Sequence, residues 1–293
     1  MEETARRLAV VTGANKGIGL ETVKQLASNG IRVILTARNE KRGLEALNKL
    51  KKCDGSFSEL VVFHQLDVAD LASITSLADF VGTNFGKLDI LVNNAGIVGV
   101  RVDTDALYAN GVRTHWTKLR NETYDLAVDC ITTNYYGAKR TAEALMPLLQ
   151  LSDAPKIVNV SSFMGKLENI QNEWANGILS DAESLTEERI DEVLHQFQRD
   201  FKEGSLHTKG WPTFLSANTM SKAAMNAFTR ILARKYPRFC INSVCPGFVQ
   251  TDINFNGGIL TVEEGAKSPV RLALLPNGGP SGLFYIRSEL STF

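Results

Sequence analysis

The chain has 293 residues, 44 % of them hydrophobic, a size that suits one large α/β domain or two small ones. Its 32 basic and 32 acidic side chains balance, which excludes a broad electrostatic grip on nucleic acid or on an anionic membrane. No apolar run approaches the roughly 18 residues of a membrane span, and the first seven residues show no signal-peptide pattern. The cysteines lack metal-type and disulfide-type spacing and are expected to be reduced thiols of a cytoplasmic protein without a metal site: Cys53, Cys130, Cys240 and Cys245.

Short apolar runs alternate with longer helix-like segments along the chain. The runs are rich in Val, Ile and Leu, as in strands buried on both faces of a parallel sheet, and lie at 8–11, 31–35, 60–63, 90–92, 157–160 and 241–244. The helix-like segments lie at about 18–40, 41–53, 70–85, 124–150 and 216–236, and Asn29-Gly30 predicts that the first ends near Ser28. This alternation predicts an α/β fold with a doubly wound parallel sheet, the Rossmann fold.

Two regions interrupt the rhythm, at 97–123 and at 165–215, and no Gly/Ser/Pro linker sets either apart. In the second, Ser184-Leu185-Thr186-Glu187 has the pattern of a capping box. An apolar stripe at helical spacing follows, formed by Ile190, Val193, Leu194, Phe197 and Phe201. Long insertions in a compact α/β domain usually form lids or binding loops. We therefore expect a single domain over 1–293, in which both insertions form a helical, substrate-covering lid.

A glycine-rich loop follows the first predicted strand and leads into the first predicted helix. Its sequence, Thr12-Gly13-Ala14-Asn15-Lys16-Gly17-Ile18-Gly19, has the spacing G-x-x-x-G-x-G. The glycines permit a close approach of backbone to phosphate, and the helix N-terminus offers N–H groups and a favourable dipole. Between a strand and a helix, such a loop predicts the pyrophosphate site of a dinucleotide. The expected contacts are Gly13, Asn15, Lys16, Gly17, Ile18 and Gly19.

The residue after the second predicted strand indicates which dinucleotide is bound. Arg38 stands where enzymes for NAD usually have an Asp or Glu that binds the ribose 2′-hydroxyl. A guanidinium can instead bind the 2′-phosphate of NADP, and Lys16 adds positive charge nearby. Lys41 and Arg42 are either further contacts or part of a solvated helix face. The predicted cofactor is therefore NADPH/NADP+.

Further motifs give the chain a resemblance to the short-chain dehydrogenase/reductase family over nearly its whole length. Asn93-Asn94-Ala95-Gly96 is similar to the family's sheet motif, and Asn134 resembles its helix Asn. Ser162 ends the fifth predicted strand, where the family has its catalytic Ser, and Lys222 stands on the next helix. The resemblance also implies cofactor contacts at Asp67, Val68, Asn94, Lys222, Pro246, Gly247 and Thr251.

Within this family the chain resembles the plant group of salutaridine reductase, menthone/neomenthol reductase and isopiperitenone reductase. Asn172-Glu173-Trp174-Ala175, the helix start at 185–188 and the segment 275–282 carry this resemblance. It implies a monomeric NADPH enzyme with a flap over a terpenoid or alkaloid substrate. Apolar residues such as Phe163 and Phe248 likewise favour a bulky hydrophobic small molecule.

One catalytic group of the family is absent. Asn218 stands four residues before Lys222, where the family has a Tyr that donates a proton. A carboxamide does not donate a proton in this way near neutral pH, and the loss of a general acid typically costs about 10²- to 10⁴-fold in rate. The expected catalytic set is Asn134, Ser162, Asn218 and Lys222. In it, Ser162 (or Ser161) donates a hydrogen bond to the substrate oxygen, Lys222 holds the nicotinamide ribose and Asn134 holds a water.

Three interpretations of the reaction remain open. In the favoured one, hydride adds to the C=C bond of an enone or to an iminium carbon, so that Ser162 and Asn218 need only donate hydrogen bonds. Isopiperitenone reductase, within the resemblance, reduces such a C=C bond and also departs from Tyr. In the second, ketone and alcohol are interconverted by another proton donor, or Asn218 is an engineered replacement of Tyr; the candidate donors are Tyr136, Glu173, Asp252, His115, His195 and His207. In the third, the scaffold guides a non-redox cyclisation or isomerisation, or only binds a ligand.

Overall fold

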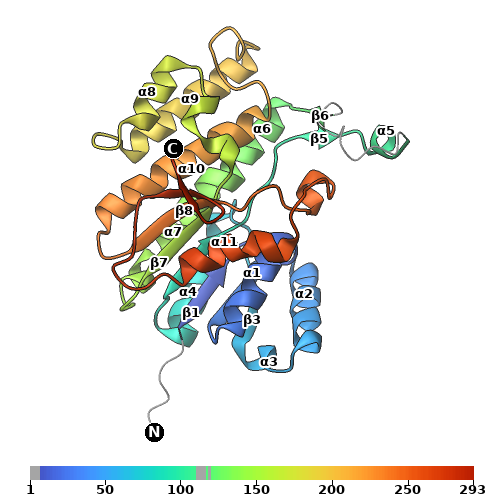
Figure 1. Cartoon of the computed structure of the whole chain (residues 1–293), viewed down its shortest axis with the longest axis vertical. Coiled ribbons are helices and arrows are strands. Elements are labelled where there is room, and N and C mark those ends of the chain that lie inside the picture. Colours follow the sequence, from blue (N-terminus) through green and yellow to red (C-terminus); the bar gives the residue numbers. More distant parts are fainter. Residues whose placement is uncertain (1–6, 110–116, 118–119) are drawn as a thin grey trace.

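An eight-stranded sheet forms the centre of the computed structural model, which describes residues 7–109, 117 and 120–293 (Figure 1). The strand order is β10-β9-β8-β7-β4-β1-β2-β3, and all neighbours are parallel except β9 and β10. The strands are β1 (Leu8–Val11), β2 (Arg32–Ala37), β3 (Val61–Gln65), β4 (Ile90–Asn93), β7 (Lys156–Val160), β8 (Cys240–Cys245), β9 (Phe284–Ile286) and β10 (Glu289–Ser291). The predicted doubly wound sheet is confirmed, and its order reverses between β1 and β4, where α/β sheets bind ligands.

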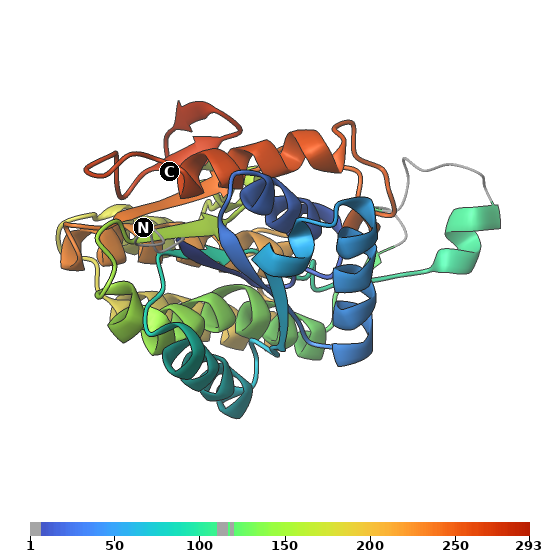
Figure 2. The same ribbon diagram turned by 90° about the horizontal axis from the view of Figure 1, so that it is seen from below.

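Side chains of each strand alternate between two helical layers. In β1, Leu8 and Val10 join one buried apolar cluster, whereas Ala9 and Val11 join the other. One layer contains α4 (Leu71–Phe85), α6 (Tyr124–Ile131), α7 (Gly137–Leu149) and α10 (Ser216–Lys235). The opposite layer contains α1 (Gly17–Ser28), α2 (Glu40–Cys53) and α11 (Val262–Ala273), with the short α3 (Phe57–Leu60) beside them (Figure 2). Burial on both faces explains why the strands are continuous apolar runs.

The segment predicted as one helix at 124–150 consists of three pieces. α6 ends at Ile131, a π-helical turn, η2 (Thr132–Tyr136), follows, and α7 begins at Gly137. The buried side chain of Asn134 within this turn bonds the backbone of Ile97. Such turns are rare and often lie at functional sites. The predicted helix-like segment is confirmed, and the π-helical turn within it was not predicted, because apolar periodicity does not register a bond between a side chain and a distant backbone.

The insertion at 165–215 contributes two helices, α8 (Glu173–Ser180) and α9 (Glu187–Lys202), that lie over α10 (Figure 1). The short 3₁₀ turns η3 (Phe163–Gly165) and η4 (Leu167–Asn169) precede them. The predicted capping box was placed two residues too early: Thr186 is the N-cap of α9 and accepts from the N–H of Arg189, whereas Ser184 bonds Asp181. The predicted apolar stripe is confirmed, with Phe201 only partly buried.

Two arginines of α10 fasten the turn between α8 and α9. Arg230 donates to the carbonyl oxygens of residues 179 and 180, at 3.4 and 3.1 Å. Arg234 donates to those of residues 182, 183 and 185, at 2.5, 2.7 and 2.6 Å. Carbonyl groups at a helix end lack intrahelical partners, and the guanidinium groups supply them. The insertion at 165–215, called the flap from here on, is therefore held against α10 through its two helices.

The insertion at 97–123, called the arm below, is described only in part. β5 (Arg101–Val102) and β6 (Arg120–Asn121) pair antiparallel, and α5 (Thr104–Ala109) lies at the outer end of the arm (Figure 2), with Leu107 in a small apolar cluster that includes Leu215. His115, one of the candidate proton donors, lies outside the described residues.

The C-terminal part contains elements that the sequence patterns did not predict. α11 packs beside α1 although it contains Pro269, and β9 with β10 extends the sheet at one edge. α11 begins with a capping box formed by Thr261 and Glu264, which was a visible sequence signal.

Candidate active site

The glycine-rich loop lies at the carboxyl end of β1 and opens into α1. Gly13 and Gly17 have φ values of 62° and 56°, which favour glycine. A Cβ atom on Gly19 would lie 2.4 Å from Asn94 Nδ2, so only glycine fits there. Lys16 is the N-cap of α1, and its side chain makes no capping bond. The N–H groups of the first turn are thus available to a phosphate, as the spacing of the loop predicts.

Asn94 braces this loop from the end of β4. Its Nδ2 donates to the carbonyl oxygens of Thr12 and Gly13, at 2.9 and 3.1 Å, and its backbone N–H donates to Thr12 Oγ1 at 3.0 Å. Asn15 and Ile18 lie partly exposed on the loop and the first turn of α1. Asn94 therefore shapes the phosphate loop, and its direct contact with a cofactor stays a prediction.

Replacing Gly19 by Ala should weaken NADPH binding. The added methyl group would overlap Asn94 Nδ2 and lie 2.8 Å from the Gly13 carbonyl oxygen. Overpacking costs about 1–3 kcal/mol, so the Kd for NADPH should rise about 5- to 100-fold in a fluorescence titration. Gly82→Ala is the matched control, because its Cβ would make only an ordinary 3.8 Å contact with Leu148. An unchanged Kd for the Gly19 variant would contradict this role.

The predicted contacts for the adenosine half lie at the ends of β2 and β3. Arg38 follows β2 and is exposed, and Asp67 follows β3 with Oδ1 accepting from Ala69 N at 3.0 Å. Val68 is buried, and a Cβ on Gly137 would lie 2.8 Å from its Cγ2. Much of the Val68 side chain therefore packs against η2 and α7, which leaves Arg38 and Asp67 as the accessible members of this group.

The loop after β8 reaches the phosphate loop. It begins at Pro246 and Gly247, which has a φ of 92°. Further along, Thr251 Cγ2 lies 3.2 Å from where a Cβ on Gly17 would stand. Lys16 Nζ and Asp252 Oδ2 form an ion pair of 2.8 Å between exposed side chains. The glycine-rich loop and the loop after β8, although distant in the sequence, are therefore in contact at the carboxyl edge of the sheet.

Asn134 and Asn218 share one hydrogen-bond acceptor, the carbonyl oxygen of Ile97. Asn134 Nδ2 donates to it at 2.9 Å and Asn218 Nδ2 at 3.2 Å, while Asn134 Oδ1 accepts from Ile97 N at 2.8 Å. Asn134 Nδ2 also donates to Ser221 Oγ at 3.0 Å, and that hydroxyl donates to the carbonyl oxygen of Asn218 at 2.8 Å. A closed ring of hydrogen bonds therefore ties η2, the start of the arm and the first turns of α10 together. Asn218 is the third residue of α10, within the first turn of the helix.

Lys222 is buried beside this ring. Its Nζ donates to the carbonyl oxygen of Val160 at 2.7 Å, and a Cβ on Gly96 would lie 3.6 Å from Nζ. Burial disfavours the ammonium and lowers the pKa of Lys222 to about 8, partly offset by Cys130 and Cys245. At neutral pH this lysine is thus a cation that can release a proton readily.

The two serines at the end of β7 face different partners. Ser161 is buried, and its hydroxyl donates to the carbonyl oxygen of Lys222 at 3.4 Å. Ser162 Oγ accepts from Met164 N at 3.1 Å, as the N-cap of η3, and remains partly exposed. A hydroxyl that accepts one bond can still donate its proton to another oxygen. Ser162 is therefore the better placed of the two for a substrate.

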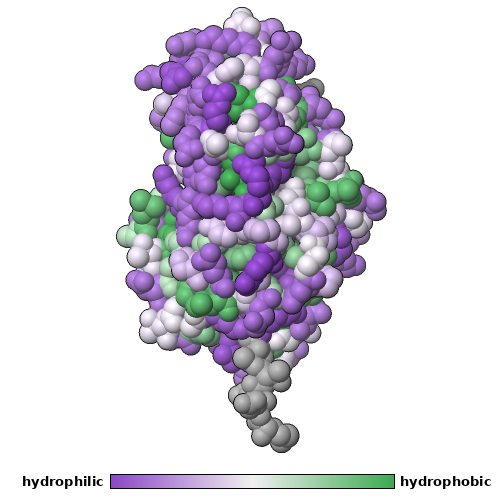
Figure 3. Space-filling model, turned by 90° about the vertical axis from the view of Figure 1, so that its left-hand side faces the viewer, coloured by the Kyte–Doolittle hydropathy of each residue, from purple (hydrophilic) through white to green (hydrophobic). Residues whose placement is uncertain are grey.

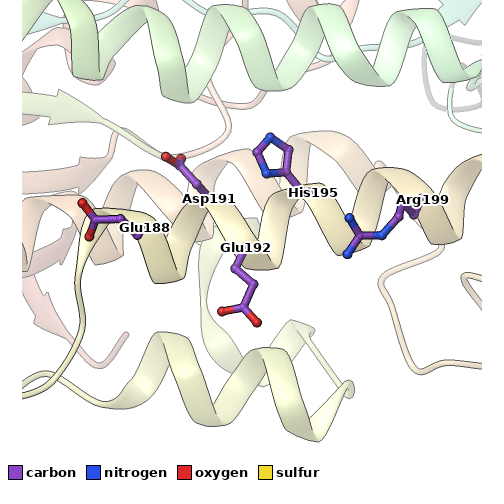
Figure 4. A pocket seen from close by; sticks show the side chains of 5 residues that line it. All are labelled: Glu188, Asp191, Glu192, His195 and Arg199. Atoms are coloured by element: carbon purple, nitrogen blue, oxygen red, sulfur yellow. The ribbon is translucent and has the colours of Figure 1, made fainter.

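Within the described residues, the other proton donors considered from the sequence have partners or surroundings of their own. Tyr136 bonds Asp191 of α9, and burial, with that carboxylate, raises its pKa far above the usual value. His195 lines a surface pocket along α9 (Figure 4), and Asp252 pairs with Lys16. Glu173 and His207 are exposed on the flap. Sequence reasoning missed Lys222 itself as a proton source, because its depressed pKa arises only from burial.

Known proteins resemble this chain in both sequence and structure. The family profile for short chain dehydrogenases matches residues 7–174, and the (+)-neomenthol dehydrogenase of Arabidopsis thaliana is 60 % identical over the whole of both chains. The chain belongs to the short-chain dehydrogenase/reductase family. Another member, the (−)-isopiperitenone reductase of Mentha piperita, is 51 % identical over 97 % of each chain. The structure of salutaridine reductase from Papaver somniferum matches with a TM-score of 0.91 and 52 % identity, covering 96 % of this chain and 99 % of that one.

This short-chain dehydrogenase/reductase uses NADP(H), as predicted. Carbonyl reductase [NADPH] 1 of Bos taurus is 36 % identical over 94 % of this chain and 95 % of that protein. When bound, NADPH supplies a hydride. The glycine positions and the uncapped start of α1 suit its pyrophosphate, and no carboxylate stands at residue 38 to repel a 2′-phosphate. Arg38 would hold that phosphate and Lys222 the nicotinamide ribose.

Arg38→Asp should shift the preference of the enzyme from NADPH toward NADH. A carboxylate repels the 2′-phosphate and can bind a 2′-hydroxyl, and loss of a charge-assisted bond of about 1.5–3 kcal/mol corresponds to about 10- to 100-fold in Kd. The Kd values for both cofactors, measured by fluorescence, check this. Lys49→Asp, at an exposed position further along α2, is the control with the same charge change, and an equal shift in both variants would show that only overall charge matters.

Metal-ligating clusters and membrane-spanning helices are both absent from the part of the chain that the structure describes. In 7–109, 117 and 120–293, no three His, Cys, Asp or Glu side chains are grouped so that they could hold a metal ion. Within the same ranges, no helix combines the length and the apolar character needed to cross a membrane. The described part of the face shown in Figure 3 is mostly hydrophilic, with its apolar residues in separate patches.

Proposed function

We propose that this enzyme reduces a bulky, mostly apolar compound of the terpenoid or alkaloid type. Of the eleven large apolar side chains that are most exposed in the described residues, four follow β7 or β8 and two lie on the flap. They are Phe163, Phe248, Ile253, Ile259, Trp174 and Phe214. Exposed apolar residues gathered beside the carboxyl ends of parallel strands favour a hydrophobic substrate at that edge. The names of the relatives, neomenthol dehydrogenase and salutaridine reductase, agree with this class.

The bond that is reduced is proposed to be the C=C bond of an enone or the C=N bond of an iminium ion. The observation that carries this is Asn218, whose amide lies on the first turn of α10 and bonds Ile97. An amide can donate hydrogen bonds to an enolate oxygen but cannot protonate an alkoxide. Ser162 would donate a second hydrogen bond to the same oxygen. Reduction of an iminium carbon gives a neutral amine and needs no proton on the product nitrogen.

Lys222 is proposed to supply the proton that an enolate finally needs at its α-carbon. Among the described ionisable groups, it is the one buried between the hydrogen-bond ring and the end of β7. Its Nζ has three protons, of which one bonds Val160, and a water could carry another to the substrate. Solvent then returns the proton to the amine.

Ketone reduction is the second candidate, and the relatives favour it. The chain resembles proteins named dehydrogenase and carbonyl reductase, whose names point to an alcohol and a carbonyl group. In this case Lys222 would protonate the alkoxide through a water, whereas the phenol of a Tyr would donate its proton directly.

A panel of matched substrates separates these candidates. Purified enzyme is given NADPH with an enone, its saturated ketone and a cyclic iminium salt of similar size, and both NADPH loss and products are measured. Turnover of the enone at C=C or of the iminium supports the proposal, whereas activity on the ketone alone overturns it in favour of the second candidate. Product formed without NADPH consumption would instead indicate the non-redox interpretation.

We also propose that the flap and the arm cover the substrate and that the enzyme is a monomer. α9 packs against both α6 and α10, so these two helices do not offer a bare face to a second copy. Sedimentation at several concentrations tests the monomer. Limited proteolysis with and without a substrate tests whether the arm becomes protected.

A further inference from the structure

The first turn of α10 has no cap from its own sequence. α10 begins at Ser216, its N-cap Leu215 makes no side-chain bond, and no acidic residue lies in the first turn. A helix start normally needs a side-chain acceptor or a negative charge for its N–H groups. The uncapped N–H groups lie beside the candidate site, because Asn218 belongs to the same turn.

Glu122, at the end of the arm, supplies the missing acceptor. Its Oε2 accepts from Ser216 N at 2.9 Å and from Ser216 Oγ at 2.6 Å. The carboxylate is largely buried, with 13 % of its side chain exposed, and Arg120 Nε lies 3.6 Å from its Oε1. Bonds from an N–H and a hydroxyl to a carboxylate are charge-assisted and stronger than neutral ones.

The residue before Ser216 is held in an unfavourable conformation. Leu215 has φ 47° and ψ 49°, the left-handed region that side chains with a Cβ rarely adopt. The arm holds both of its neighbours, since the Arg120 guanidinium lies 4.5 Å from the centre of the Phe214 ring and Glu122 holds Ser216. Leu215 also packs in a small apolar cluster with Leu107 of the arm. Such a conformation persists only where the surroundings fix it, and it often marks a functional site.

The two ends of the arm therefore form hydrogen bonds with the same turn of α10. At one end, the carbonyl oxygen of Ile97 accepts from Asn218 Nδ2. At the other end, Glu122 fixes Ser216, two residues before Asn218 in the helix. A displacement of either end would change where the Asn218 side chain points.

We infer that Glu122, supported by Arg120, is a positioning residue that sets the first turn of α10 and so the direction of the Asn218 amide. It does not touch the substrate. Its consequence for the rate rests on the proposed function, whereas its role as a cap does not. The same contacts connect the arm to the Asn218 amide. The arm is proposed to cover the substrate, and the amide is proposed to bond the substrate oxygen.

Glu122→Ala tests the inference in the full-length enzyme. Misplacement of a group by about 1 Å can cost about 10²-fold, so we expect kcat to fall about 10- to 100-fold while the Kd for NADPH stays within about 3-fold. Glu122→Gln keeps an oxygen that can accept both bonds and should retain kcat within about 3-fold. Ser152→Ala is the control for stability, because Ser152 also donates to a buried carboxylate, that of Asp89, at the amino ends of the strands. It should lose thermal stability without losing kcat.

Amide hydrogen exchange over residues 216–219 gives a readout that needs no substrate. Exchange there should speed up in Glu122→Ala, and not in Ser152→Ala. Unchanged exchange, or an unchanged kcat with faster exchange, overturns the inference, as does a fall in kcat that Ser152→Ala reproduces. If the wild-type enzyme turns over none of the substrate panel, the proposed function fails, and the exchange experiment still decides whether Glu122 caps α10.

Discussion

We expect Asn218→Tyr to raise the rate of ketone reduction by about 10²- to 10⁴-fold, the usual contribution of a general acid. The side chain at 218 would then carry an ionisable hydroxyl one helical turn from Lys222 on α10, on the same face of the helix. The positive charge of Lys222 would lower the pKa of the phenol toward the working range. The measurement is kcat/KM for a saturated ketone and for the matching enone in the wild type and the variant.

Asn218→Phe is the matched control for this exchange. It adds an aromatic ring without a hydroxyl, so it should give no gain in ketone reduction. Both variants lose the bond from Asn218 Nδ2 to the Ile97 carbonyl oxygen, which should cost about 0.5–1.5 kcal/mol of stability in each. Equal rates for Tyr and Phe would show that the missing phenol does not limit the reaction.

Lys222→Met should reduce turnover by about 10²- to 10⁴-fold whichever bond is reduced, because the proton source and the proposed ribose contact are lost together. In the wild type, turnover that depends on the Lys222 proton should decline as the pH rises above about 8, where the amine becomes neutral. A pH profile of kcat with the wild type checks this. A rate that stays flat to pH 10 would exclude Lys222 as the acid.

The same lysine should leave a signature in the unfolding free energy. Its pKa is about 8 when folded, against an ordinary value of 10.5, so the unfolded chain binds the proton more tightly in this interval. Stability therefore rises with pH between about 8 and 10.5, by up to about 3 kcal/mol, and this contribution is absent below pH 8. In urea unfolding at pH 7.5, 9 and 10.5, the unfolding free energy of the wild type should therefore rise with pH relative to that of Lys222→Met, and this difference isolates Lys222 from the other buried groups that titrate in the same interval.

Local patterns predicted the parts of this molecule that depend on local physics. The strands are buried on both faces and so appear as apolar runs, and the phosphate loop has a fixed spacing because glycine alone fits at Gly13 and Gly19. The start of α9 was misplaced because Ser184 and Thr186 are both plausible caps, and only the fold selects Thr186. Tyr136 was one of several candidate proton donors, but it lies two residues from Asn134, and residues two apart on a helix do not share a face.

The contacts that shape the candidate site could not be predicted in this way. Glu122 and Ser216 lie 94 positions apart, and neither belongs to a sequence motif that would predict their contact. The pKa of Lys222 depends on burial by several elements, which a sequence does not display residue by residue. The shared acceptor at Ile97 likewise exists only because η2 and α10 meet there.

Arg230 and Arg234 bind the turn between α8 and α9 to α10, and this affects how a substrate can enter the site and how a product can leave it. A flap bonded at five carbonyl oxygens to the helix that carries residues 218 and 222 shifts only together with that helix. If the flap covers the substrate as proposed, we expect it to act as a fixed wall, with entry and exit of the substrate on the side of the arm. Changes in the arm away from Ile97 and Glu122 should then alter how long a product stays bound, whereas changes at the two arginines should alter the chemical step.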